Sequence, residues 1–218
     1  MAGSKSAVDR RPTAAIWPLI HAERAALAAD LADLSDDRWS TPSLCTELTV
    51  REVLAHITAG ASLNAFRWMV GVIRCRYDFD KQVAMRLAEQ LGATPAETLE
   101  RFRRVVTSTT KPPIPALAML GETVVHAEDI RRPLGMRRDH PTETITMVAE
   151  YYRGTDLVVP AKGRIDGLRL VAGDGPFATG SGPVVSGSTL ALIMAMTGRS
   201  AHLDDLQGDG VERLRERC

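Results

Sequence analysis

Cysteine is scarce in this sequence, whose 218 residues include only Cys45, Cys75 and Cys218. The number is odd and no two of the three lie close together, which argues against a disulfide framework. Free cysteines are typical of proteins kept in a reducing compartment. We therefore expect a cytoplasmic protein.

An excess of charge of one sign is also lacking, because Lys and Arg together number 27 and Asp and Glu also number 27. Such a balance provides no basic surface to attract nucleic acid or anionic lipid. Long apolar runs are missing too. None approaches the ~20 residues that span a bilayer, and the first residues lack the apolar core of a signal peptide. We therefore expect a soluble protein with neither a nucleic-acid nor a membrane partner.

Helix signals dominate the chain up to about residue 154. Apolar residues recur at helical spacing in residues 13–34. Thr49 and Glu52 form a capping-box pattern, which predicts one long helix from Thr49 to Cys75. Further helices are predicted over residues 79–91, 94–106, 116–130 and 142–152.

The composition changes near Gly154. Residues 158–187 are rich in glycine and contain short apolar runs, which predict small strands joined by tight turns. Helix signals return in residues 188–198 and at the C-terminus. We therefore predict a mainly α protein with a small α/β part: a helical domain over residues 1–154 and a small C-terminal α/β domain over residues 155–218.

Glu122, His126 and Asp129 follow one another at helical spacing, so on a helix they share one face. Charged residues four apart are usually a solvated helix face. Histidine and carboxylate are also zinc ligands, but a zinc site needs a further ligand from elsewhere in the chain.

His56 can supply that ligand, because it lies among apolar residues where an imidazole needs a polar partner. The partner is either a backbone carbonyl or, in a helical bundle, the face of Glu122 and His126. Two histidines and one carboxylate form a zinc site with an open fourth position, which implies chemistry. Asp129 then either orients His126 or replaces Glu122 as the carboxylate ligand.

Four segments, in one order along nearly the whole chain, resemble the mycothiol-dependent maleylpyruvate isomerase family: LCTELTVREVLAHITAG, DFDKQVAMRLAEQ, GETVVHAEDIRRPLG and VVSGSTLALIMAMTGRSAHLDDLQGDGVERL. The resemblance implies a DinB-like metal-binding four-helix bundle followed by a small C-terminal α/β domain. It also implies a divalent metal, typically zinc, held by His56, Glu122 and His126. One departure is that the family often shows Cys-Pro-Gly-Trp where this chain has Cys45, Thr46, Glu47 and Leu48.

The resemblance further implies mycothiol as a thiol cofactor or co-substrate, held as thiolate by the metal for addition to an electrophilic small molecule. Addition, rotation and departure of the thiol would give isomerisation, whereas retention of the thiol would give S-transfer. Two other functions stay open. One is a non-catalytic metal-binding or dimerisation module, and the other is a metal-dependent hydrolase that activates water.

Anionic groups on a substrate would call for arginine. Arg67, about three turns after His56 on the predicted long helix, and Arg199 in the C-terminal part are the candidates for binding a carboxylate. Simple surface exposure is the alternative for both. Cys45 has no neighbouring base in the sequence, and we expect it to be inert. The expected partners are a small-molecule thiol and an electrophilic substrate, and a homodimer is an open possibility.

Overall fold

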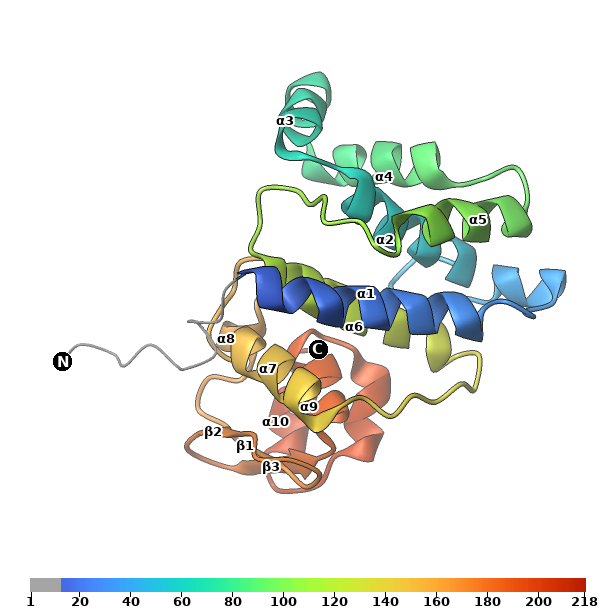
Figure 1. The fold of residues 1–218 in the computed structure, drawn as a ribbon. Coiled ribbons are helices and arrows are strands. Elements are labelled where there is room, and N and C mark those ends of the chain that lie inside the picture. Colours follow the sequence, from blue (N-terminus) through green and yellow to red (C-terminus); the bar gives the residue numbers. More distant parts are fainter. Residues whose placement is uncertain (1–12) are drawn as a thin grey trace. The chain divides into compact units, whose positions relative to one another are not determined.

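The computed structural model describes residues 13–218. The first twelve residues, where the sequence predicts no signal peptide, lie outside the described residues. Two compact units make up the described chain, Thr13–Arg137 and Arg138–Cys218 (Figure 1). Helices predominate and one small sheet is present, so the predicted mainly α fold with a small α/β part is confirmed. None of the helices within residues 13–218 is long and apolar enough to cross a membrane.

The unit Thr13–Arg137 is entirely helical apart from its loops. Its elements are α1 (Thr13–Asp30), η2 (Asp36–Ser40), α2 (Val50–Ser62), α3 (Ala65–Arg74), α4 (Phe79–Gln90), α5 (Pro95–Val105) and α6 (Ala116–Arg131). Helices α1 and α6 lie side by side, and α2 packs against α4, α5 and α6 (Figure 1). Their shared core includes Leu27, Leu54, Phe102 and Ile130, none of which is exposed to solvent.

The predicted long helix from Thr49 to Cys75 is wrong, because the chain breaks between α2 and α3. Leu63 leaves the helical region with φ −100° and ψ 102°. The Asn64 side chain then caps a new helix by accepting a hydrogen bond from the Arg67 amide at 2.9 Å. The expected apolar face therefore does not continue past the break, and Phe66 and Val70 on α3 are 77% and 45% exposed.

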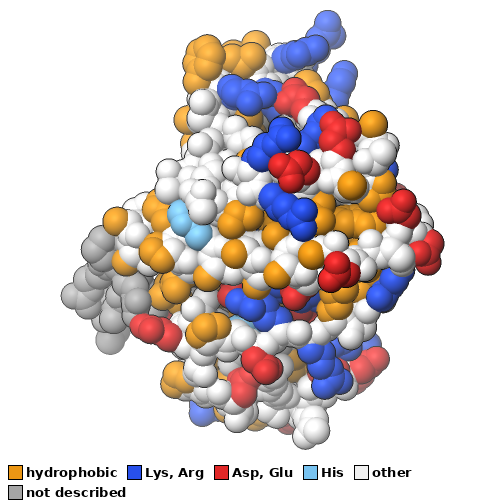
Figure 2. Space-filling model, turned by 45° about the vertical axis from the view of Figure 1, so that its right-hand side comes forward, with side chains coloured by type: hydrophobic (Ala, Val, Ile, Leu, Met, Phe, Trp, Pro, Cys, Tyr) orange, Lys and Arg blue, Asp and Glu red, His pale blue; other side chains and the backbone are white. Residues whose placement is uncertain are grey.

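Exposed apolar side chains are concentrated on α3 and on the first turns of α4. Figure 2 shows hydrophobic side chains gathered at the end of the molecule that α3 forms. The residues concerned are Phe66, Met69, Val70, Ile73, Tyr77, Phe79 and Val83. On an ordinary protein surface exposed apolar residues are scattered singly, whereas these are close together in sequence on neighbouring elements.

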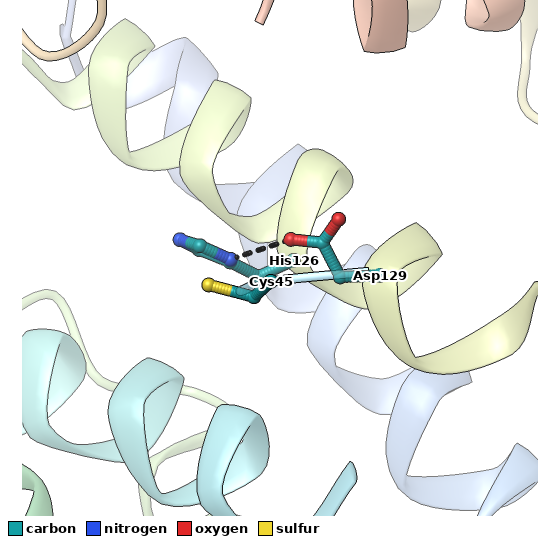
Figure 3. Close-up of side chains that lie close together, drawn as sticks. All are labelled: Cys45, His126 and Asp129. Carbon is teal, nitrogen blue, oxygen red and sulfur yellow. Dashed lines mark hydrogen bonds and ion pairs between the residues drawn. The ribbon is translucent and has the colours of Figure 1, made fainter. Parts of the chain in front are cut away.

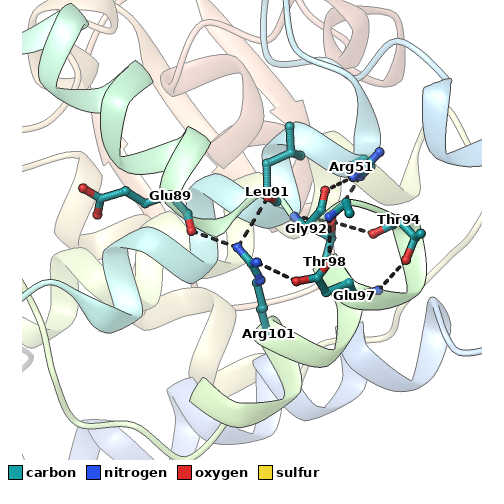
Figure 4. Close-up of polar contacts among 9 residues, drawn as sticks. Arg51, Glu89, Leu91, Gly92, Thr94, Glu97, Thr98 and Arg101 are labelled. Carbon is teal, nitrogen blue, oxygen red and sulfur yellow. Dashed lines mark hydrogen bonds and ion pairs between the residues drawn. The ribbon is translucent and has the colours of Figure 1, made fainter.

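A polar network joins the end of α4 to α2 and α5 (Figure 4). Arg51 on α2 donates to the Gly92 carbonyl and to the Thr98 hydroxyl, which in turn accepts the Gly92 amide at 3.0 Å. On the opposite side, Arg101 of α5 donates to the Glu89 carbonyl at 2.9 Å. The bond from Arg101 occupies the Glu89 carbonyl, one of the last carbonyls of α4, which a helix end leaves without partners inside the helix, and the bonds from Arg51 and Thr98 hold Gly92 just beyond it. The C-terminal end of α4 is therefore firmly positioned.

The unit Arg138–Cys218 contains a three-stranded sheet covered by helices. Its elements are α7 (Thr142–Tyr152), α8 (Ala161–Arg164), β1 (Arg169–Ala172), β2 (Ala178–Gly180), β3 (Val184–Gly187), α9 (Thr189–Met196), η3 (Ser200–Asp205) and α10 (Val211–Arg215). The central strand β1 pairs antiparallel with β2 and parallel with β3. Leu170 and Val185 are neighbours in this register and are fully buried.

The two compact units meet in sequence at Arg137 and Arg138. Helix α7 therefore clusters with the C-terminal unit, where it packs on α9, whereas the predicted helical domain 1–154 includes it. Compactness does not define which segments fold independently. The predicted domains 1–154 and 155–218 stay a prediction.

The capping box of α2 is testable because both of its hydrogen bonds are present. The Thr49 hydroxyl accepts the Glu52 amide at 3.3 Å, and the Glu52 carboxylate accepts the Thr49 amide at 2.8 Å. We expect Thr49→Ala to lower the free energy of unfolding by about 1 kcal/mol in urea denaturation. Glu52→Gln keeps an acceptor at the same place and should cost clearly less. Equal losses for both variants would contradict this role of Thr49.

Candidate metal centre

Helices α2 and α6 bring together the three residues that the sequence singles out as ligands. His56 lies in the second turn of α2, and Glu122 and His126 lie one turn apart on α6. One ligand atom from each of the three lies within 4.8 Å of the other two. The His56 and His126 rings meet edge to face, with their centroids 4.8 Å apart. His56 is 66 residues before Glu122 in the sequence. The fold therefore brings residues from two distant segments into one cluster.

The orientation of His126 is fixed by Asp129, which is fully buried one turn further along α6. Nδ1 of His126 lies 2.9 Å from Oδ2 of Asp129, and a carboxylate can only accept, so Nδ1 carries the proton. The other ring nitrogen, Nε2, lies 3.5 Å from Oε2 of Glu122. In this arrangement Asp129 orients the ring, and Nε2 is the atom that His126 directs toward Glu122 and His56.

Cys45 is a residue of this site that the sequence prediction missed. Its thiol forms a second group with His126 and Asp129, in which the ligand atoms also lie within 4.8 Å of one another. Figure 3 shows Cys45 beside the His126 ring, with the dashed bond from that ring to Asp129. The amide of Leu44 donates to the Asp129 carbonyl at 3.1 Å and so holds the Cys45 loop against α6. No pattern in the local sequence signals this contact, because it depends on how a loop packs.

The loop that carries Cys45 keeps an unusual backbone conformation. Glu47 adopts φ 66°, which lies in the left-handed region that glycine tolerates best. This is the position at which the family pattern Cys-Pro-Gly-Trp has glycine. This chain therefore has a glutamate in the left-handed conformation at the position where that pattern has glycine.

The charge state of His126 is set by its burial and by the carboxylates of Asp129 and Glu122. Burial by itself lowers the pKa of His126, but hydrogen bonds to Asp129, Cys45 and Glu122 outweigh burial and hold this pKa well above its usual value. Without a metal, a proton on His126 therefore balances the negative charge of its neighbours. A divalent cation would take over that role and require a neutral His126.

A pocket with an empty volume of about 790 Å³ opens onto this centre. Its lining includes His56, Glu122 and His126 together with a largely apolar wall of Ile57, Ala59, Leu63, Trp68, Phe79, Val83, Pro112, Ile114 and Met119. The remaining lining residues are Gly60, Gln82, Arg86 and Thr123. A pocket of this size with few polar groups suits a small organic ligand.

Pro112 and Ile114 come from the loop between α5 and α6, which is tied down from two sides. The Ser108 hydroxyl donates to the Ala61 carbonyl of α2 at 2.9 Å. Nη1 of Arg24, a fully buried residue of α1, donates to the Ser108 carbonyl at 2.9 Å. Burial lowers the pKa of Arg24 to about 10, so it is still charged at neutral pH.

The two arginines predicted to bind a substrate anion do not line this pocket. Arg67 lies beyond the helix break, on α3, where its exposed guanidinium pairs with Glu89 at 3.4 Å. Arg199 belongs to the C-terminal unit, where its Nη1 donates to the Thr197 carbonyl at 2.9 Å. A carboxylate-binding role for either residue stays a prediction. The arginine that does line the pocket is Arg86 of α4, which the sequence prediction did not single out.

The unit Thr13–Arg137 is thus a helical bundle with a histidine and carboxylate cluster at a pocket. Residues 20–113 match the family described as the mycothiol maleylpyruvate isomerase N-terminal domain. This match agrees with the resemblance found in the sequence and covers part of the unit Thr13–Arg137. The matched segment includes His56 and ends before Glu122 and His126.

Two solved structures share the fold over most of the chain. A crystal structure of the mycothiol-dependent maleylpyruvate isomerase is 15% identical with a TM-score of 0.62, and one of a mutant of that enzyme is 14% identical with a TM-score of 0.60. Each comparison covers 94% of this chain and 96% of the other. At these identities the similarity establishes the fold. No curated protein matches the sequence significantly.

Two groups of candidate ligands share His126, and they predict opposite effects of substitutions on zinc content. If His56, Glu122 and His126 hold the metal, Cys45→Ser should leave the zinc content of the purified protein unchanged, whereas Glu122→Gln should remove most of it, because an amide is a poor zinc ligand. If Cys45, His126 and Asp129 hold it, the two results are reversed. Metal analysis by mass spectrometry after gel filtration separates these outcomes.

Removing the Asp129 carboxylate should weaken zinc binding without abolishing it. We expect Asp129→Ala to lower zinc affinity by about 10- to 100-fold in competition with a chromophoric chelator, because the His126 ring loses its hydrogen-bonded orientation. Asp129→Asn retains an acceptor and should fall between this variant and the wild type. An Asp129→Ala affinity equal to that of the wild type would mean that the ring is held by packing alone.

Proposed function

We propose that this protein is an enzyme that uses zinc and mycothiol to isomerise a small unsaturated substrate. The observation that carries the proposal is the convergence of His56 from α2 with Glu122 and His126 from α6 at the wall of one apolar pocket. The match to the mycothiol maleylpyruvate isomerase N-terminal domain family and the shared fold support the choice of thiol and reaction.

The residues present fit a zinc ion. Two imidazoles and one carboxylate are a common ligand set for zinc in enzymes, and they leave a coordination position for a ligand from the pocket. The hydrogen bond from Nδ1 of His126 to Asp129 is the support that histidine ligands of zinc usually have. When bound, zinc would hold a thiol as thiolate, and this thiolate can add reversibly to a conjugated double bond.

The chain itself contributes orientation and a dry environment. Asp129 fixes the tautomer and direction of His126. The apolar side chains that line the pocket, such as Trp68, Ile114 and Met119, limit the water around a bound ligand. Fewer water molecules favour addition of a thiol over hydrolysis and strengthen electrostatic interactions at the centre.

Other proposals for the same site differ in the fate of the thiol. S-transfer requires that the thiol stays on the product, and a hydrolase would bind water in place of the thiol. A non-catalytic metal-binding module would bind neither substrate. The predicted cytoplasmic location and homodimer stay predictions.

The metal can be tested directly. Purified wild-type protein should contain about one zinc per chain, and His56→Ala and His126→Ala should contain far less, with far-ultraviolet circular dichroism confirming that both are folded. Thr94→Ala, which changes an exposed cap of α5, is a matched control and should keep its zinc. A wild type with no more zinc than the two histidine variants would contradict the proposal.

The thiol and the reaction can then be separated. Isothermal titration with mycothiol should give saturable binding to the zinc-loaded protein and weaker binding after zinc removal. Maleylpyruvate with catalytic mycothiol should isomerise in the presence of wild-type protein and not in the presence of His56→Ala. Stoichiometric loss of free thiol would indicate S-transfer, and turnover without any thiol would indicate a hydrolase or a thiol-independent enzyme.

A further inference from the structure

Helix α3 presents an apolar face to solvent. Four of its residues have the i, i+3, i+4 and i+7 spacing that places side chains on one face of a helix: Phe66, Met69, Val70 and Ile73. In a globular protein such a face normally lies against the core. Each of the four is at least 45% exposed here, and the buried residues of α3 are Gly71 and Val72.

Another side of α3 is attached to α4, which fixes the direction of the apolar face. Nε2 of Gln82 donates to the Trp68 carbonyl at 2.9 Å, and Nη2 of Arg86 donates to the Arg67 carbonyl at 2.7 Å. The Trp68 ring also stacks with Phe79, with the ring centroids 6.2 Å apart. Turning the apolar face toward α4 would break these contacts, so the fold directs it outward.

The exposed apolar surface continues over the turn and onto α4. Seven of the ten large apolar side chains that are exposed within residues 13–218 lie between residues 66 and 83. We call these seven the α3–α4 face: Phe66, Met69, Val70, Ile73, Tyr77, Phe79 and Val83. Apolar side chains exposed singly are normal, whereas a group of this size marks an interaction site.

The α3–α4 face is large enough for a stable dimer. Phe66, Tyr77 and Phe79 are 77%, 71% and 55% exposed, and an aromatic side chain can bury roughly 200 Å², so these three leave on the order of 400 Å² uncovered. One partner in a standard interface contributes about 800 Å², a little more than half of it apolar. The three aromatic residues therefore supply most of the apolar area that a dimer needs, and the other four add the rest.

The charges beside the face favour a second copy of this chain as its partner. Two exposed arginines, Arg74 and Arg76, are followed at the same spacing by two exposed aspartates, Asp78 and Asp80. None of the four forms an ion pair within residues 13–218. Two such segments related by a two-fold axis place the arginines of each beside the aspartates of the other. An anionic membrane surface would instead repel both aspartates.

We propose that two copies of this chain form a homodimer through the α3–α4 face. Arg74 of each copy pairs with Asp80 of the other around the apolar centre of the interface. Phe79 and Val83 belong to this face and also line the pocket, so the second copy covers the rim of the pocket. The inference goes beyond the proposed function and does not depend on zinc or mycothiol.

The mass of the full chain in solution tests the proposal. Size-exclusion chromatography with light scattering should give twice the mass of one chain at micromolar concentrations. Ile73→Asp should raise the dimer dissociation constant at least about tenfold, because it places an unpaired charge in the apolar centre of the interface. Leu157→Asp is the matched control, since it makes the same type of change outside the face at a residue that is 61% exposed, against 60% for Ile73, and it should stay dimeric.

Both positions are exposed, so neither change should unfold a single chain, and far-ultraviolet circular dichroism checks this. A wild type that is monomeric at these concentrations overturns the inference. So does an Ile73→Asp variant that dimerises as tightly as the Leu157→Asp variant.

A charge exchange tests the two-fold arrangement. Arg74→Asp and Asp80→Arg should each weaken the dimer by about tenfold, because each brings like charges together at two symmetry-related places. Combining the two changes restores opposite charges and should return the dissociation constant to near the wild-type value. A merely structural effect of either change would not be reversed by the other. A double variant no more dimeric than the single ones overturns the pairing.

Sedimentation with vesicles of phosphatidylglycerol or phosphatidylcholine examines a membrane as the other occupant of the face. The dimer should stay in the supernatant with both lipids. A monomer that sediments with phosphatidylglycerol, and no longer does so as Ile73→Asp, overturns the inference and assigns the face to a lipid surface. None of these measurements requires zinc or mycothiol, so their outcome is separate from that of the proposed function.

Discussion

The hydrogen bond between Asp129 and His126 is the interaction on which the centre depends. An aspartate that is fully buried within α6 must be paired, and its pairing with Nδ1 leaves Nε2 directed toward Glu122 and His56. The backbone of the same aspartate accepts the Leu44 amide and so brings the Cys45 loop against the ring. A single turn of helix thereby determines the tautomer, the direction of the imidazole and the position of a nearby thiol.

Much of this arrangement was predictable from local sequence. The spacing of Glu122, His126 and Asp129 places them on one helix face, and the apolar surroundings of His56 indicate a histidine that needs a partner. Helices over residues 142–152 and 116–131 agree with their patterns to within a residue or two. These features are local, since they follow from helical periodicity and from the cost of burying polar groups.

The features that could not be predicted are those that depend on packing between segments. The break at Leu63 has no proline to mark it, and it moves Arg67 onto another helix, away from the lining of the pocket. Cys45 and Arg86 make contacts with other segments that their local sequence does not signal, a turn of α6 for Cys45 and the Arg67 carbonyl of α3 for Arg86. Periodicity predicts which residues share a face of one helix. It does not predict which residues of another helix that face contacts.

The break between α2 and α3 separates the cluster from the opposite wall of its pocket. The histidine and carboxylate cluster belongs to α2 and α6, whereas the wall opposite is formed by α3 and α4 and is held by side-chain bonds from Gln82 and Arg86 to backbone carbonyls. Because the chain bends at Leu63, substitutions in α3 and α4 can reshape the wall while the α2 turn that carries His56 stays in register. The shape of the pocket and the geometry of the histidine and carboxylate cluster are therefore set by different helices, and one can change without the other.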